Sequence, residues 1–173
     1  KEIAQELGYS LKVAIIKCSQ KKETVARAFA KGKIKALPNA PKLTKKTILN
    51  CTNIVALAGA EQIIHALNEK PDIIIAGRTT DTAIIAALPI LKGVDPGLAW
   101  HGAKIGECGA LCTSNPTSGV ILIEFCDSYF TVEPMSKKAK ATAKTVSAHM
   151  LYENSDPFQL LEPGGHLDVT NAS

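Results

Sequence analysis

The chain has 173 residues, of which 46% are hydrophobic and 5% aromatic, and its net charge is +4. This length and apolar content suffice for one domain with an aliphatic core and exclude an intrinsically disordered chain. No apolar run approaches the roughly 20 residues needed to span a bilayer, so we expect no membrane partner. The five cysteines form no CxxC pair, and we interpret them as reduced thiols of a cytoplasmic protein.

The positive charge is concentrated in one part of the chain. Residues 12–46 contain eleven Lys and Arg residues and a single acid, Glu23, and a second group of lysines lies at 137–144. Arginines are few, and aromatic side chains do not alternate with the lysines as they do in RNA-binding surfaces. We therefore expect no nucleic-acid partner, and a solvated face or an attraction for small polyanions instead.

The first half of the chain alternates between expected strands and helices. It begins at Lys1, inside a helical pattern that ends at Gly8, and we expect it to be a single domain excised from a longer protein. Apolar runs predict strands at residues 11–16, 53–57 and 72–76. Periodicity and stop signals predict helices at residues 23–31, 44–49, 59–69 and 80–88, the last limited by Pro89.

The second half has a different pattern. Residues 97–112 predict one helix, and the apolar runs 119–125 and 129–133 flank a short polar turn, which indicates a β-hairpin. A helix at 145–153 and a short strand at 166–169 follow. The alternation predicts an α/β fold with a mostly parallel sheet, flanking helices in Rossmann-like layers, and an antiparallel hairpin near 119–133.

The turn Gly77-Arg78-Thr79-Thr80-Asp81 lies between an expected strand and helix, where α/β proteins often bind anions. The glycine permits close backbone approach or a positive φ. Either threonine can cap the helix, and the arginine can grip a carboxylate or phosphate. The alternative is a capped connection in which the arginine and the aspartate merely pair.

A second candidate site consists of His101, Lys104, Glu107 and Cys108. If residues 98–111 are helical, His101, Lys104 and Cys108 share a face of the helix, and Glu107 lies at the edge of that face. The lysine could stabilise an enolate, with the histidine or the glutamate as general base, and the cysteine could be a thiolate of lowered pKa. The alternative is a solvated lysine–glutamate pair beside a buried cysteine.

Other residues give weaker signals. His149 and Glu153 lie four residues apart on an expected helix that Asp156 helps to end, and they form a possible second group. No HxxxH, HxH or CxxC spacing exists, so we predict no metal site. Motifs for nucleotide binding by a P-loop, for dinucleotides and for serine hydrolases are also absent from the sequence.

Several segments resemble the acyclic terpene utilisation family, long a domain of unknown function. They are VALAGAEQIIHAL, IIIAGRTTDTAIIAALPI, AWHGAKIGECGALC and KTVSAHMLYENSDPFQLLEPGGHLDV. The matching positions are Gly77, Arg78, Asp81, His101, Lys104, Glu107, Cys108, His149, Tyr152, Glu153, Asp156, Pro157, Gly164 and Gly165. The resemblance implies a bacterial protein of several hundred residues that acts beside acyl-CoA enzymes in the breakdown of citronellol-like compounds. It assigns no reaction, catalytic residue or cofactor.

Two functional hypotheses follow. In the first, the chain is an enzyme domain of carboxylate or acyl-CoA catabolism: Arg78 holds an anionic ligand, while His101, Lys104 and Glu107 carry out proton chemistry. In the second, it is a non-catalytic binding or assembly module, whose conspicuous residues contact other parts of the full-length protein or a second copy in a homo-oligomer.

Overall fold

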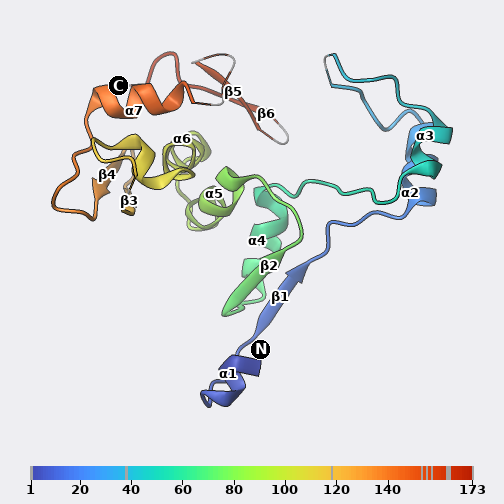
Figure 1. Ribbon diagram of the computed structural model, residues 1–173, viewed down its shortest axis with the longest axis horizontal. Helices are drawn as coiled ribbons and strands as arrows, with labels where there is room; N and C mark the ends of the chain where they lie inside the picture. Colours follow the sequence, from blue (N-terminus) through green and yellow to red (C-terminus); the bar gives the residue numbers. More distant parts are fainter. Residues whose placement is uncertain are drawn as a thin grey trace.

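A computed structural model describes residues 2–37, 39–117, 119–152, 154, 156, 158–162 and 165–172. Figure 1 shows its elements in chain order. The helices are α1 Glu2–Glu6, α2 Lys22–Ala30, α3 Lys45–Asn50, α4 Ala60–Asn68, α5 Asp81–Leu91, α6 Pro96–Gly106 and α7 Ala143–Met150, with a 3₁₀ turn η1 at Gly109–Cys112. The strands are β1 Val13–Ile16, β2 Ile73–Ala76, β3 Ile121–Phe125, β4 Phe130–Pro134, β5 Gln159–Glu162 and β6 Gly165–Asp168.

The strands form three separate two-stranded sheets among the described residues, so the prediction of an extended, mostly parallel sheet in Rossmann-like layers is wrong. Only β1 and β2 are parallel, with Val13 opposite Ile73 and Ile16 opposite Ala76. The predicted hairpin is confirmed: β3 pairs antiparallel with β4, from Ile121 opposite Pro134. The remaining pair, β5 with β6, is also antiparallel.

The segment at 53–57 explains why no larger parallel sheet forms. It was predicted to be a strand, but it makes only isolated bridges, Ser19 with Val55 and, just beyond it, Ala58 with Thr79. The first bridge is antiparallel and the second is parallel. The segment therefore passes from the end of β1 to the end of β2. A third parallel strand would instead run alongside β2.

Helices α2 and α3 form an arm that stands away from the other helices (Figure 1). They pack on each other through the buried side chains of Ala26 and Ile48. The two segments that connect the arm to the body, before α2 and after α3, are joined by two backbone hydrogen bonds, from Gln20 N to Ile54 O at 2.8 Å and from Ala56 N to Cys18 O at 2.9 Å. The predicted helices at 23–31 and 44–49 are thus confirmed within one residue at each end.

Helices α4, α5 and α6 form the centre of the molecule. Alanines make the close contacts: Ala83, Ala86 and Ala87 of α5 and Ala99 and Ala103 of α6 are all 0% exposed. Small side chains let helix backbones approach closely, so α5 and α6 pack tightly along their length.

The β3–β4 hairpin packs against α6 where that helix carries glycines. A Cβ at Gly102 would lie 2.6 Å from Cε1 of Phe125, and a Cβ at Gly106 would lie 2.6 Å from Cδ1 of Ile123. These contacts are far shorter than van der Waals contact. The two glycines therefore set how closely the hairpin approaches the helix.

Two hydrophobic clusters build the core, and Trp100 packs against both. One lies among α4, α5 and the parallel strands, with Ile63 and Ala87 at its centre. The other joins α6, η1, α7 and the β5–β6 hairpin around Ile105 and Leu160. The single tryptophan thus connects the two halves of the chain.

Two helix predictions need correction. The helix expected at 97–112 ends at Gly106, and η1 begins at Gly109, which has a φ of +55°. A left-handed residue cannot continue an α-helix, so the expected single stripe is interrupted. Pro89 lies inside α5 and does not end it, because in the last turn a proline removes only one backbone hydrogen bond.

Candidate functional site

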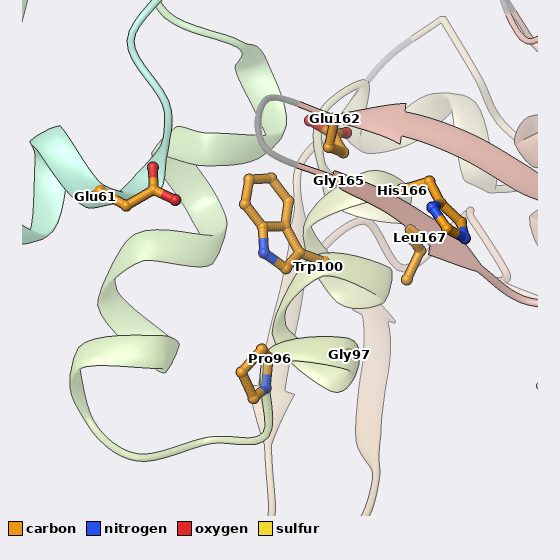
Figure 2. A pocket seen from close by; sticks show the side chains of 8 residues that line it. All are labelled: Glu61, Pro96, Gly97, Trp100, Glu162, Gly165, His166 and Leu167. Carbon is orange, nitrogen blue, oxygen red and sulfur yellow. The ribbon is translucent and has the colours of Figure 1, made fainter.

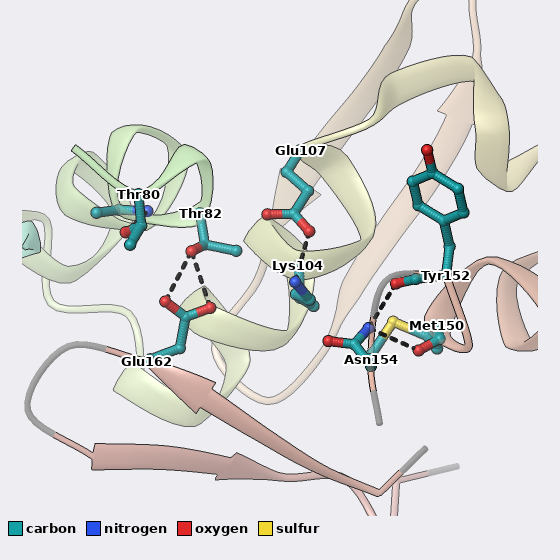
Figure 3. A network of polar contacts seen from close by, with 9 residues as sticks. Thr80, Thr82, Lys104, Glu107, Met150, Tyr152, Asn154 and Glu162 are labelled. Atoms are coloured by element: carbon teal, nitrogen blue, oxygen red, sulfur yellow. Dashed lines mark hydrogen bonds and ion pairs between the residues drawn. The ribbon is translucent and has the colours of Figure 1, made fainter. Parts of the chain in front are cut away.

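The first turn of α5 is joined to the end of β5 by a side-chain contact. The Thr82 hydroxyl lies 2.8 Å from both carboxylate oxygens of Glu162 and donates to that group. Thr82 is 1% exposed, and Glu162 is partly buried. The group bound at the first turn of this helix is the protein's own carboxylate, held by the Thr82 side chain (Figure 3).

A salt bridge on α6 lies close to this carboxylate. Nζ of Lys104 donates to Oε1 of Glu107 at 2.6 Å, and both side chains are 15% exposed. Burial raises the pKa of Glu162, while the Thr82 hydrogen bond and the Lys104 charge lower it and the Glu107 charge raises it. We call Thr82, Lys104, Glu107 and Glu162 the Glu162 cluster (Figure 3).

A cavity of about 280 Å³ opens beside the cluster. Its walls come from four elements, and its lining residues are Glu61, Pro96, Gly97, Trp100, Glu162, Gly165, His166 and Leu167. Figure 2 shows the Trp100 indole standing between Glu61 on one side and the β5–β6 hairpin on the other. Glu162 belongs both to this wall and to the cluster, which links the cavity to an ionisable group.

The turn at 77–81 is held mainly through its backbone. Gly77 N donates to Ile16 O at 3.0 Å, and Gly77 does not have a positive φ. The Thr80 hydroxyl accepts from Ala83 N at 3.3 Å, which confirms that a threonine caps the helix.

The charged side chains of this turn, Arg78 and Asp81, are exposed, and the structure pairs neither of them with a described charged group. The backbone of Arg78 is bonded to Cys18: its N–H donates to the sulfur at 3.2 Å, and its carbonyl accepts from the thiol at 3.1 Å. The remaining residue, Thr79, donates its hydroxyl to Ala58 O at 3.0 Å.

The structure brings only part of the second candidate group together. Lys104 and Glu107 pair, whereas the His101 ring packs edge-on against Phe130 of the hairpin, with ring centroids 5.2 Å apart. Burial lowers the pKa of His101. Cys108 lies beyond the end of α6, at the start of η1, so it does not continue the helical stripe.

In the possible second group, His149, Glu153 and Asp156, the contacts of the described residues are local. The His149 side chain is buried at 7% exposure and stacks on Tyr152, with Nδ1 lacking a hydrogen-bond partner among the described residues. The Asp156 carboxylate accepts from Phe158 N at 2.8 Å and Gln159 N at 3.0 Å, which lowers its pKa. Glu153 lies outside the described residues.

Sequence reasoning missed Thr82 and Glu162, which are 80 residues apart. Neither belongs to a motif, and a lone glutamate carries no signal of its chemistry. Trp100 lines the cavity and also packs against both hydrophobic clusters.

Within the described ranges, no helix is both long and apolar enough to cross a bilayer. No group of three or more His, Cys, Asp or Glu residues is placed to hold a metal ion in that same part of the chain. None of the five cysteines, all of which lie in the described ranges, forms a disulfide.

Comparison with known proteins gives one match. Residues 1–94 match the family model described as acyclic terpene utilisation family protein AtuA. No curated protein and no solved structure matches the chain. The matched region extends from α1 through α5 and includes the turn at 77–81 and Thr82, while Lys104, Glu107 and Glu162 lie beyond it. Because the match covers more than half of the 173 residues, the chain belongs to the acyclic terpene utilisation family.

Proposed function

We propose that the chain is an enzyme domain of carboxylate or acyl-CoA catabolism, in which Glu162 moves a proton at the carbon next to an acyl carbonyl. The proposal is supported mainly by one observation: Glu162 belongs both to the cavity wall and to the Glu162 cluster. Its carboxyl group lines the cavity, and it is also bound to Thr82 and exposed to the charges of Lys104 and Glu107.

Each member of the cluster has a chemical role. A carboxyl whose pKa is raised by burial exchanges protons at a pH closer to neutrality, which suits a general acid or base. The Lys104 charge lowers the pKa of Glu162 and so favours the carboxylate form that accepts a proton, and the 2.6 Å contact with Glu107 holds the ammonium in place. The exposed Arg78 would bind a carboxylate or phosphate group outside the cavity.

Proton exchange at the α-carbon tests this role. The protein is incubated with butyryl-CoA in D₂O, and loss of the α-proton signal is followed by NMR. Wild type should catalyse exchange, since the base returns a deuteron from solvent to the carbon from which it took a proton. Glu162→Gln should abolish the exchange, and Glu133→Gln, an exposed glutamate of β4, should retain it. Equal rates in wild type and Glu162→Gln would contradict the assignment.

A second candidate function is assembly, and the open face of the parallel pair favours it. Ile16 and Ile74 pack against the core, whereas Ile15, Ile73 and Ile75 are 65%, 42% and 54% exposed. Parallel sheets are normally covered on both faces. This face would therefore bind another part of the full-length protein or a second copy of the chain.

Charge also favours assembly. Residues 12–46 carry eleven cations and one acid, a net +10, whereas the rest of the chain carries nine cations and fifteen acids, a net −6. A segment of one sign in a chain whose remainder carries the other sign attracts a second copy in a salt-dependent way. Sedimentation velocity at low and high salt tests this. A monomer at every concentration and salt level, unchanged in Ile73→Lys/Ile75→Lys, would contradict self-assembly.

A further inference from the structure

The cavity beside Trp100 has an acidic lining. Two of its residues are carboxylic acids, Glu61 from α4 and Glu162 from β5, and they lie on either side of the indole (Figure 2). No lysine or arginine is among the described residues that line it, and His166 is its only other ionisable group. A ligand inside therefore meets a negative field on two sides.

The Lys104 charge does not reverse this field. Lys104 acts on Glu162 electrostatically, but its ammonium is already bound to Glu107 at 2.6 Å, and that pair carries no net charge. A carboxylate entering the cavity would lose hydration and face like charges without a free cation to compensate. Repulsion of this kind distinguishes ligands of similar shape but different charge.

The rest of the wall suits an uncharged acyl group. Trp100, Pro96 and Leu167 supply apolar surface, while Gly97 and Gly165 add no side chain that would fill the space. A volume of about 280 Å³ is near the lower end of the range for small-molecule pockets, about 300–1,000 Å³. It accommodates a short acyl chain with its carbonyl, and a nucleotide carrier would remain outside.

We infer that this cavity selects the neutral carbonyl of a thioester or ester and excludes the corresponding free carboxylate, because Glu61 and Glu162 flank the Trp100 wall. The inference rests on the proposed proton-transfer function and narrows its substrate class from carboxylates and acyl-CoA thioesters to the thioesters. It also assigns Glu61 a specificity role that does not require contact with the reacting atoms.

Ligand binding can be followed by the fluorescence of Trp100, because it is the only tryptophan in the chain and lies in the cavity wall. Its fluorescence is titrated at pH 7.5 with S-butyryl-N-acetylcysteamine, a neutral thioester, and with butyrate. The thioester should bind about tenfold more tightly or better, as expected for one like-charge contact near a protein surface. Glu61→Gln should reduce this ratio several-fold by improving butyrate binding. Glu69→Gln, which changes an exposed residue at the end of the same helix, should leave it unchanged.

The outcomes separate this inference from the proposed function. The inferred selection of the thioester over the carboxylate is wrong if butyrate binds as tightly as the thioester or more tightly. It is also wrong if Glu61→Gln leaves the ratio of the two affinities unchanged, or if Trp100 fluorescence responds to neither ligand. If α-proton exchange persists in that case, the proton-transfer role of Glu162 stands. If the thioester binds more tightly but no α-proton exchange is observed, the selection is supported and only the proton-transfer role of Glu162 is contradicted.

Discussion

The contact between Thr82 and Glu162 should contribute measurably to stability, because it joins α5 to the β5–β6 hairpin across 80 residues of sequence. Thr82→Val removes the hydroxyl and keeps the shape of a side chain that is 1% exposed. A hydrogen bond to a charged group contributes about 1.5–3 kcal/mol. Glu162 is only partly buried, so water can replace part of the bond, and we expect a coupling of about 1–1.5 kcal/mol.

A double-mutant cycle isolates this coupling. The free energy of unfolding in urea is measured for wild type, Thr82→Val, Glu162→Ala and the double variant. Thr82→Ser is the matched control: it loses a buried methyl group, at about 1 kcal/mol, but keeps the hydroxyl and should retain most of the coupling. If Thr82→Val costs the same with and without Glu162, the contact does not stabilise the fold and this reasoning is wrong.

Three further predictions concern packing, titration and capping. Gly102→Ala should destabilise the protein to urea, because overpacking against Phe125 at 2.6 Å costs about 1–3 kcal/mol and exceeds the gain of about 1 kcal/mol in helix propensity. Adding Phe125→Leu should restore stability, and a stabilising Gly102→Ala would contradict the packing. Burial lowers the pKa of His101, so the native state binds fewer protons than the unfolded state just below the ordinary histidine pKa, and stability should fall as pH drops through that window. His101→Leu should lose this part of the pH dependence in unfolding measured from pH 7 to 5; an unchanged slope would refute it. Thr80→Ala should lower the free energy of unfolding by about 1 kcal/mol, since it removes the cap of α5, and an unchanged urea midpoint would argue against the cap.

The sequence predicted most local elements because local signals determine them. The apolar run at residues 121–125, the polar turn and the run at 130–134 specify a hairpin by themselves. Thr80 caps α5, as its position before an apolar helix indicated. Strand pairing depends on distant partners, however, and the alternation of strands and helices did not reveal that residues 54–58 cross between strand ends instead of joining a sheet.

The site was predictable only where its members are neighbours in sequence. The three-residue spacing of Lys104 and Glu107 indicated their pair. The same pattern placed Cys108 on a continuous helix, which the left-handed Gly109 and the end of α6 at Gly106 rule out. Glu162 reaches the cluster through the packing of the β5–β6 hairpin on α6, and no spacing rule connects it with Thr82.

The titration of Glu162 tests the central claim most directly, namely that this partly buried carboxyl group belongs to a charged cluster at the cavity. Side-chain ¹³C NMR of the labelled protein, assigned with Glu162→Gln, gives its pKa. The account predicts a value above the ordinary glutamate value of about 4.3, raised by burial. Lys104→Met and Thr82→Val should each raise it further, because both residues lower it in wild type. An ordinary pKa for Glu162, unmoved by either substitution, would contradict the cluster and the function proposed from it.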